Sequence, residues 1–258
     1  MVTDAPPEAP PYDGPLFVEV TAAPGDDTAD RSGAAGRVVD CDATPVGSSE
    51  ESPYGGGVDR EPAAALGRSV RSYTPEASGD LRVARTEDDR ILYTWETGRR
   101  TRLAFIVRHG TGGDHKTGWY VESWARCDWA ELPPAWATTR GLQVWTDRHG
   151  RPVPTSEVVS HVASGADCLP AGMTVLDLSG GSLEHGRSYA ARPDPDYYPY
   201  FFTVPYAEGQ SLPAGARDTG YERDGRHLWL AADRSRAYVG TTSSVDVWPA
   251  EVQPLGCA

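Results

Sequence analysis

The sequence predicts a mainly β protein, built as an antiparallel meander or sandwich with one short helix. Two observations predict this class. Short runs of β-branched and aromatic residues recur from residue 80 onward, and turns containing glycine bound them. The 258 residues also include 28 glycines and 22 prolines, which favour many turns and few long helices. A chain of this length is enough for one large domain or two small ones.

The first 37 residues predict a disordered, acidic tail or linker. They contain six prolines and seven acidic side chains but only two arginines. A segment of this composition buries too little apolar area to order itself, although residues 16–20 predict a short strand. The β-rich globular unit is expected over residues 38–258. Near its start, residues 61–66 predict a helix of one or two turns, because a proline stands at an early position where its missing N–H does no harm.

Strands are predicted along the rest of the chain wherever aromatic and β-branched residues cluster. The predicted strands are residues 90–95, 103–107, 119–124, 142–145, 174–178, 200–204, 226–230, 236–240 and 245–248. The glycine-rich residues 110–118 and the Asp-Arg-His-Gly sequence at 147–150 predict hairpin turns between them.

The last three runs repeat an earlier pattern. Each copy consists of two aromatic runs and a Val-acid-x-Trp run, and a cysteine follows each copy. This repetition predicts two diverged β-rich halves, residues 38–135 and 136–258. The alternative is that any two aromatic hairpins look alike over runs this short. The matched segments are residues 90–93 with 226–229, residues 104–107 with 237–239, and residues 121–124 with 245–248.

The four cysteines predict two disulfides and an oxidising compartment. None lies in a Cys-x-x-Cys spacing, which excludes a zinc ribbon and a thioredoxin-like motif. Of the three possible pairings, the favoured one joins Cys41 to Cys127 and Cys168 to Cys257, because these spacings of 86 and 89 positions would close each half separately. The alternative is four buried free thiols in a cytosolic protein.

Four segments resemble a known group of proteins. They read Val-Glu-Ser-Trp-Ala-Arg-Cys-Asp at 121–128, Val-Trp-Thr-Asp at 144–147, Gly-Arg-Pro-Val-Pro-Thr at 150–155 and Gly-Arg-His-Leu-Trp-Leu at 225–230. They are similar to segments of uncharacterised extracytoplasmic proteins of high-GC actinobacteria, over roughly residues 80–250. The resemblance implies a secreted or surface-anchored protein and carries no assigned activity. The acidic start of this chain is no export signal, so either the targeting segment is absent or the protein is cytosolic.

Charge and motifs exclude several classes of function. A net charge of −13 argues against nucleic-acid and anionic-membrane partners, and no run is long enough to span a membrane. The six histidines are scattered, so no metal site is predicted, and no cofactor is expected. Residues 110–117 nearly match a phosphate-binding loop, but His115 replaces the required second glycine and a strand follows where a helix is needed.

The Arg-His-Gly sequence at 108–110 suggests one enzyme hypothesis as the alternative to a non-catalytic function. A predicted strand leads into Arg108-His109-Gly110, which is how histidine phosphatases present their nucleophile, so a hydrolase acting on a phosphoryl ester through His109 and Arg108 is the alternative function. The surrounding chain lacks the alternating strand–helix pattern of that family. The same tripeptide also recurs in the hairpin turn at 148–150, which favours a structural role.

The favoured function is a non-catalytic extracytoplasmic binding or scaffold module. The expected ligand site is an aromatic segment next to carboxylates, which suits a sugar or a cationic peptide because both stack on rings. A strand packed in a β core is the alternative interpretation of this segment. The expected partner is a cell-surface protein, a peptide or a carbohydrate. The candidate ligand residues are Asp194, Asp196, Tyr197, Tyr198 and Tyr200.

Overall fold

The structure, a computed structural model, is mainly β, as predicted, with 46% of the described residues in strands and 16% in helices. It describes residues 12–20, 31–49, 57–77, 79–112, 115–163, 171–179, 187–193 and 201–252. The chain divides into two compact units, residues 1–132 and 133–258. The described helices are α2 (Gly33–Val38), α3 (Pro62–Tyr73) and α4 (Pro134–Thr139), with the 3-10 turns η1 (Pro75–Ala77) and η2 (Trp129–Glu131).

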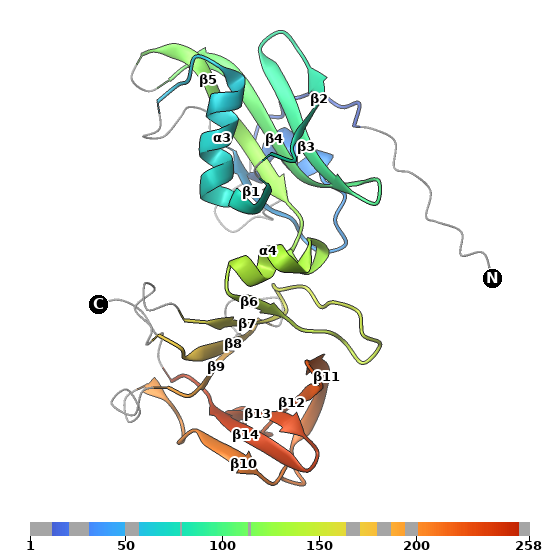
Figure 1. Cartoon of the computed structure of the whole chain (residues 1–258), viewed down its shortest axis with the longest axis vertical. Helices are drawn as coiled ribbons and strands as arrows, with labels where there is room; N and C mark the ends of the chain where they lie inside the picture. The colour runs from blue at the N-terminus through green and yellow to red at the C-terminus, as the bar shows by residue number, and fades with distance from the viewer. Residues whose placement is uncertain are drawn as a thin grey trace, which may run out of the picture. The chain divides into compact units, whose positions relative to one another are not determined.

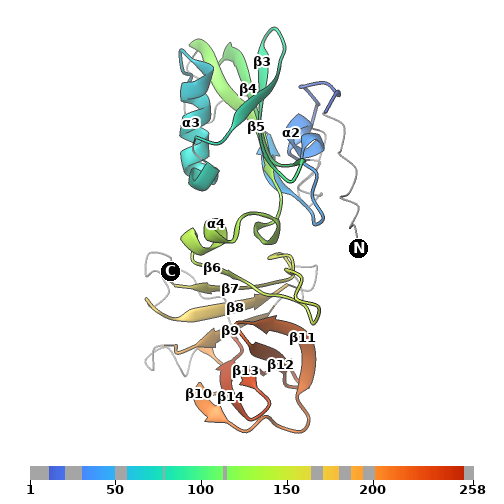
Figure 2. The ribbon, with the colours of Figure 1, turned by 45° about the vertical axis from the view of Figure 1, so that its right-hand side comes forward.

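The first unit contains one five-stranded antiparallel sheet (Figure 1). Four consecutive strands form a meander, and the strand that precedes them pairs with the last, which gives the order β1-β5-β4-β3-β2. Figure 2 shows α3 and α2 on opposite faces of this sheet. The strands are β1 (Val46–Ser49), β2 (Arg82–Thr86), β3 (Arg90–Thr97), β4 (Arg100–Thr111) and β5 (Thr117–Arg126).

Both faces of this sheet are buried. On one face, small and aliphatic side chains such as Ala104 and Ile106 pack against α2 and against Leu16, which is fully buried. On the other face the rings of Phe105 and Trp124 stack, and Tyr73 of α3 covers Trp124. Because strand side chains alternate between faces, a single strand supplies both layers.

The described parts of the predicted tail therefore differ from the expectation. Leu16 and the alanines of α2 lie in the core, and residues 16–20 form no strand. The composition of residues 1–37 does not reveal this role, because the few apolar residues that reach the core stand in a segment rich in proline and acidic side chains.

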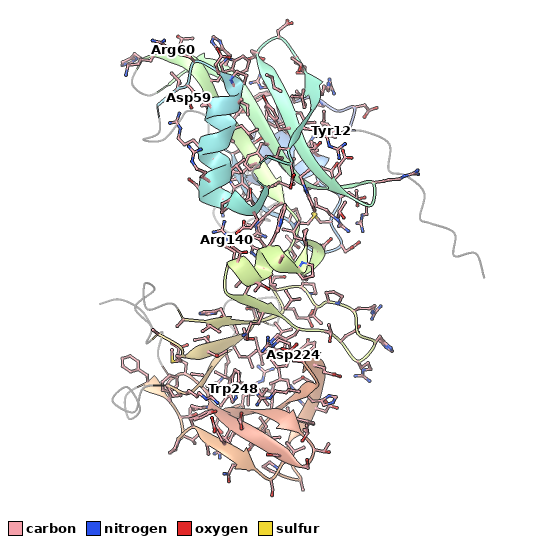
Figure 3. All side chains as sticks on the ribbon, in the orientation of Figure 1. Tyr12, Asp59, Arg60, Arg140, Asp224 and Trp248 are labelled. Atoms are coloured by element: carbon pink, nitrogen blue, oxygen red, sulfur yellow. A yellow bond between two sulfur atoms is a disulfide. The ribbon has the colours of Figure 1, made fainter. Side chains whose placement is uncertain are left out.

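The second unit contains two antiparallel sheets, with orders β6-β7-β8-β9 and β10-β14-β13-β12-β11. Single bridges join them at both sides, from Tyr189 to Ala250 and from Thr146 to Glu222. Their core includes Trp145, which is 1% exposed, and Trp248, which extends from β14 (Figure 3). The strands are β6 (Leu142–Val144), β7 (Val158–Val162), β8 (Thr174–Leu178), β9 (Arg187–Ala191), β10 (Ala207–Gln210), β11 (Arg217–Arg223), β12 (Arg226–Leu230), β13 (Arg236–Thr241) and β14 (Ser244–Pro249).

The five-stranded sheets of the two units have the same strand order. In both, a four-strand meander is extended by the preceding strand, which pairs with the last strand of the meander. The three sequence matches fall on equivalent strands, β3 with β12, β4 with β13 and β5 with β14. The pairing register agrees for the first two, because Leu92 faces Ile106 and Leu228 faces Val239. Divergence of the two halves from one ancestor stays a prediction.

The predicted disulfide between Cys41 and Cys127 is present, with Cα atoms 5.2 Å apart. It ties the segment after α2 to the residue that follows β5. Cys168 and Cys257 lie outside the described residues, so their pairing stays a prediction. Within the described ranges, no helix is both long and apolar enough to cross a membrane.

Candidate functional site

The predicted ligand residues Asp194, Asp196, Tyr197, Tyr198 and Tyr200 all lie outside the described residues. The structure does describe the chain on either side of them. These flanking residues show how the two flanks are joined and which aromatic neighbours of the segment are buried.

The two flanks of the predicted ligand segment are joined by a small polar cluster. Before the segment, the Nε of Arg192 donates to Glu208 Oε1 at 2.9 Å, and after it the hydroxyl of Tyr206 donates to the same oxygen at 2.7 Å. Burial and this hydrogen bond to a carboxylate raise the pKa of Tyr206 to about 12. Arg192 has a φ of +51°, a backbone conformation that non-glycine residues seldom adopt. Glu208 therefore joins Arg192, which precedes the segment, to Tyr206, which follows it.

The aromatic residue pair that follows the segment belongs to the core. Phe202 is 7% exposed and belongs to a cluster with Met173, which precedes β8, and with Val175 and Ala190 of the β6–β9 sheet, against which Phe201 packs. The predicted strand at 200–204 is absent, since the described residues 201–204 make only an isolated bridge from Phe202 to Glu251. For Phe201 and Phe202, the alternative interpretation is therefore correct: these rings pack in the core.

Arg108 and His109 do not converge on one point. They are successive residues of β4, so their side chains point to opposite faces of the sheet. The Nη1 of Arg108 donates to Glu122 Oε1 at 3.0 Å, whereas the exposed ring of His109 lies edge-on to Trp119, with centroids 5.1 Å apart. This placement does not form the pair of nucleophile and phosphoryl-binding arginine that the hydrolase hypothesis requires.

A small, shallow pocket with a volume of about 40 Å³ lies in the first unit where α3 packs beside β5 and β1. Its lining combines two aromatic rings, three serines, a valine and one carboxylate-bearing residue. These are Ser48, Ser69, Tyr73, Val121, Glu122, Ser123 and Trp124. The rings of Tyr73 and Trp124 stack with centroids 4.4 Å apart and an interplanar angle of 19°.

Trp124 is an unusual member of this pocket. Its indole Nε1 is buried and has no hydrogen-bond partner in the part of the chain that the structure describes. Leaving a buried N–H unpaired costs about 1–3 kcal/mol. An indole N–H can only donate, so the group that would satisfy it must be an acceptor.

The pocket lies along the edge of β5 that pairs with β1. β1 ends where Ser49 pairs with Ser123, and farther along this edge a described bridge joins Asp59 to Trp119. Asp59 stands just before α3 (Figure 3), and its carboxylate forms an ion pair with Arg68 of that helix.

Glu122 occupies a β-bulge at the same place. Ile106 pairs with Ser123 and Val107 with Val121, so Glu122 is the extra residue on β5. Its side chain is 6% exposed, and its two oxygens accept hydrogen bonds from Arg90 at 2.8 and 2.9 Å in addition to the one from Arg108. The buried carboxylate is therefore fully compensated by two guanidinium groups.

No local pattern in the sequence predicts this pocket. Its lining comes from β1, α3 and β5, and β1 was not predicted as a strand because Val-Gly-Ser-Ser lacks the aromatic and β-branched content of one. Comparison with protein families, with curated proteins and with solved structures finds no match for this chain.

Proposed function

We propose that the protein is a non-catalytic extracytoplasmic module that binds a cationic peptide or a cationic segment of a cell-surface protein. The contacts come from Tyr197, Tyr198 and Tyr200, and the carboxylates of Asp194 and Asp196 orient the cation. The observation that supports this proposal is the Arg192–Glu208–Tyr206 cluster, which ties the two flanks of the ligand segment together. In general, joining the flanks of a binding loop lowers the entropy that the loop loses when it binds.

Charge and redox chemistry support the same proposal. A protein with a net charge of −13 attracts cations over long distances and repels anions. Tyrosine rings add a cation–π attraction to a lysine or arginine placed over their faces. The Cys41–Cys127 disulfide is the kind of bond that persists outside the reducing cytosol.

The test is isothermal titration of the full chain with hexalysine at low and high salt. We expect binding that weakens with salt, and we expect Tyr198→Ala to weaken it by about tenfold, since one ring over a cation contributes on the order of 1–2 kcal/mol. The double variant Asp194→Asn/Asp196→Asn is expected to weaken it further.

The matched control is Asp88→Asn/Asp224→Asn, which removes the same charge from two exposed residues elsewhere. Equal weakening by both double variants would show that hexalysine senses only net charge, and the site assignment would be wrong. Binding of chitohexaose in place of hexalysine, lost in Tyr198→Ala, would reassign the segment to carbohydrate.

A further inference from the structure

We propose that the second unit binds a phosphate group at three arginines that lie around the exposed rim of its core. The three come from the start of β9, from the start of β11 and from the turn between β12 and β13. They are Arg187, Arg217 and Arg234. All three are exposed, and none of them forms an ion pair within the part of the chain that the structure describes.

Two of these arginines lie on the facing surfaces of the two sheets. Arg187 is on the same face of β9 as Tyr189, because side chains alternate along a strand. Arg217 pairs with Leu230 of β12, and residues that pair directly share one face of a sheet. Tyr189 and Leu230 both belong to the core between the sheets, so the two arginines stand at the rim of that core.

The Tyr189 hydroxyl connects the third arginine with the other two. It donates to the carbonyl oxygen of Arg234 at 3.3 Å, which places the turn between β12 and β13 against β9. Burial raises the pKa of Tyr189, and the positive charges of Arg187, Arg234 and Arg217 oppose this rise. One buried hydroxyl therefore lies within the electrostatic reach of all three guanidinium groups.

The acidic residues beside these arginines are directed elsewhere. Asp233 also acts on the Tyr189 hydroxyl, but its carboxylate accepts hydrogen bonds from the backbone N–H and the hydroxyl of Ser235. Asp218 follows Arg217 and therefore lies on the opposite face of β11. Like charges gathered at one place repel each other, and a bound anion relieves that repulsion.

A phosphate group suits three guanidinium groups better than a carboxylate does. Guanidinium groups form paired N–H···O bonds with phosphate oxygens. A phosphate monoester also carries about two negative charges near neutral pH and offers three acceptor oxygens, whereas a carboxylate carries one charge on two oxygens. The net charge of −13 does not prevent local binding, because exposed charges farther away than about 8 Å are largely screened at physiological salt.

The experiment is an NMR titration of the ¹⁵N-labelled full chain with sodium phosphate at neutral pH, with sodium chloride holding the ionic strength constant. The backbone amide signals of residues 187–189 and 233–235 are followed. We expect them to shift saturably with a Kd of about 1–10 mM. Methyl phosphate is titrated in parallel. Tighter binding of the inorganic ion assigns the site to free phosphate, and equal or tighter binding of the ester assigns it to the phosphate group of a larger molecule.

The matched variants are Arg217→Gln and Arg82→Gln. Each removes one exposed arginine without a described ion pair from a strand, but Arg82 belongs to β2 in the first unit. We expect Arg217→Gln to weaken phosphate binding by about fivefold, the equivalent of about 1 kcal/mol, because one charge-assisted hydrogen bond is lost. Arg82→Gln is expected to leave the binding unchanged.

Three outcomes would overturn the proposal. They are the absence of a saturable shift with phosphate at about 100 mM, shifts that sodium chloride alone reproduces, and equal weakening by Arg217→Gln and Arg82→Gln. The proposal does not depend on the peptide site, since Arg217→Gln leaves residues 194–200 unchanged and should bind hexalysine at least as tightly as the wild type. A failure of the phosphate site is therefore distinguishable from a failure of the proposed peptide site.

Discussion

Arg102 holds the disulfide-bearing segment to the sheet. Its Nη1 donates to the carbonyl oxygen of Asp40 at 2.7 Å, contacts the Glu131 carboxylate and lies 3.9 Å from the Cys127 sulfur. The side chains of Arg102 and Glu131 are both only 10% exposed. The ion pair between Arg102 and Glu131 is therefore almost fully buried. Loss of the arginine leaves the carboxylate of Glu131 buried without its charged partner.

We expect Arg102→Ala to lower the free energy of unfolding by about 3–5 kcal/mol. The neighbouring Arg100 is 29% exposed and pairs with Asp40 and Asp42, so Arg100→Ala should cost about 1 kcal/mol or less. Urea denaturation of both variants provides the measurement. Equal losses of unfolding free energy in the two variants would mean that burial does not determine how strongly each arginine stabilises the fold.

Two tyrosines should make the protein sensitive to alkaline pH. Burial and a hydrogen bond to a carboxylate raise the pKa of Tyr206 and that of Tyr221 to about 12, the partners being Glu208 and Glu157. In the unfolded chain a tyrosine has a pKa of about 10. The folded state disfavours the tyrosinate, so this contribution is fully present below pH 10 and is lost as the pH rises from about 10 through about 12.

The measurement is the pH dependence of the urea midpoint, with tyrosinate absorbance recorded in parallel. We expect the wild-type midpoint to fall over this pH window more steeply than that of Tyr206→Phe/Tyr221→Phe. The two proteins share every other titrating group, so parallel curves would contradict the assignment.

At the scale of the strand, the two equivalent sheets carry the same cross-strand ion pair in different surroundings. Arg90 of β3 reaches over β4 to Glu122 of β5, and Arg226 of β12 reaches over β13 to Asp246 of β14. The first pair is 11% and 6% exposed, whereas the second is 41% and 22% exposed. β5 has a bulge at Glu122, whereas β13 and β14 pair without a register shift. In the first unit Arg90 also lies under the ring of Phe17, 4.9 Å from its centroid.

Double-mutant cycles should therefore give unequal couplings. We expect about 1.5–3 kcal/mol between Arg90 and Glu122, which form a bidentate charged hydrogen bond out of water. Between Arg226 and Asp246 we expect about 0.2–1 kcal/mol, because water competes for the pair. Alanine substitutions and chemical denaturation measure both couplings. A larger value for the exposed pair would show that burial does not control the coupling.

Most strands rich in aromatic and β-branched residues were predictable from the sequence. The predicted runs at 90–95, 103–107, 226–230, 236–240 and 245–248 lie on β3, β4, β12, β13 and β14. The strands β1, β2, β7, β9, β10 and β11 were missed. An edge strand such as Arg-Val-Ala-Arg-Thr carries charge on both faces and leaves no alternation to detect, whereas β7 was missed although its three valines suit a strand. The pocket was also unpredictable, since the stacking of Tyr73 on Trp124 depends on the packing of α3 and not on any local pattern.

At the scale of the whole molecule, each unit has its own core. Leu92, Ala104 and Ile106 belong to the core of the first unit, and Leu176, Leu228 and Trp248 to that of the second. The Cys41–Cys127 disulfide lies entirely within the first unit. Domains with separate cores can unfold separately, so a change confined to one core should leave the other transition in place.

Differential scanning calorimetry of the full chain is therefore expected to show two transitions. Cys41→Ser/Cys127→Ser should lower only one of them, since opening a loop of 86 residues removes a stabilisation of up to about 4.5 kcal/mol. Leu228→Ala should lower only the other, by about 2–5 kcal/mol, because Leu228 is fully buried between the two sheets of the second unit. Serine variants are preferred to a reducing agent because they leave Cys168 and Cys257 unchanged. If both substitutions lowered the same single transition, the two units would fold as one cooperative body.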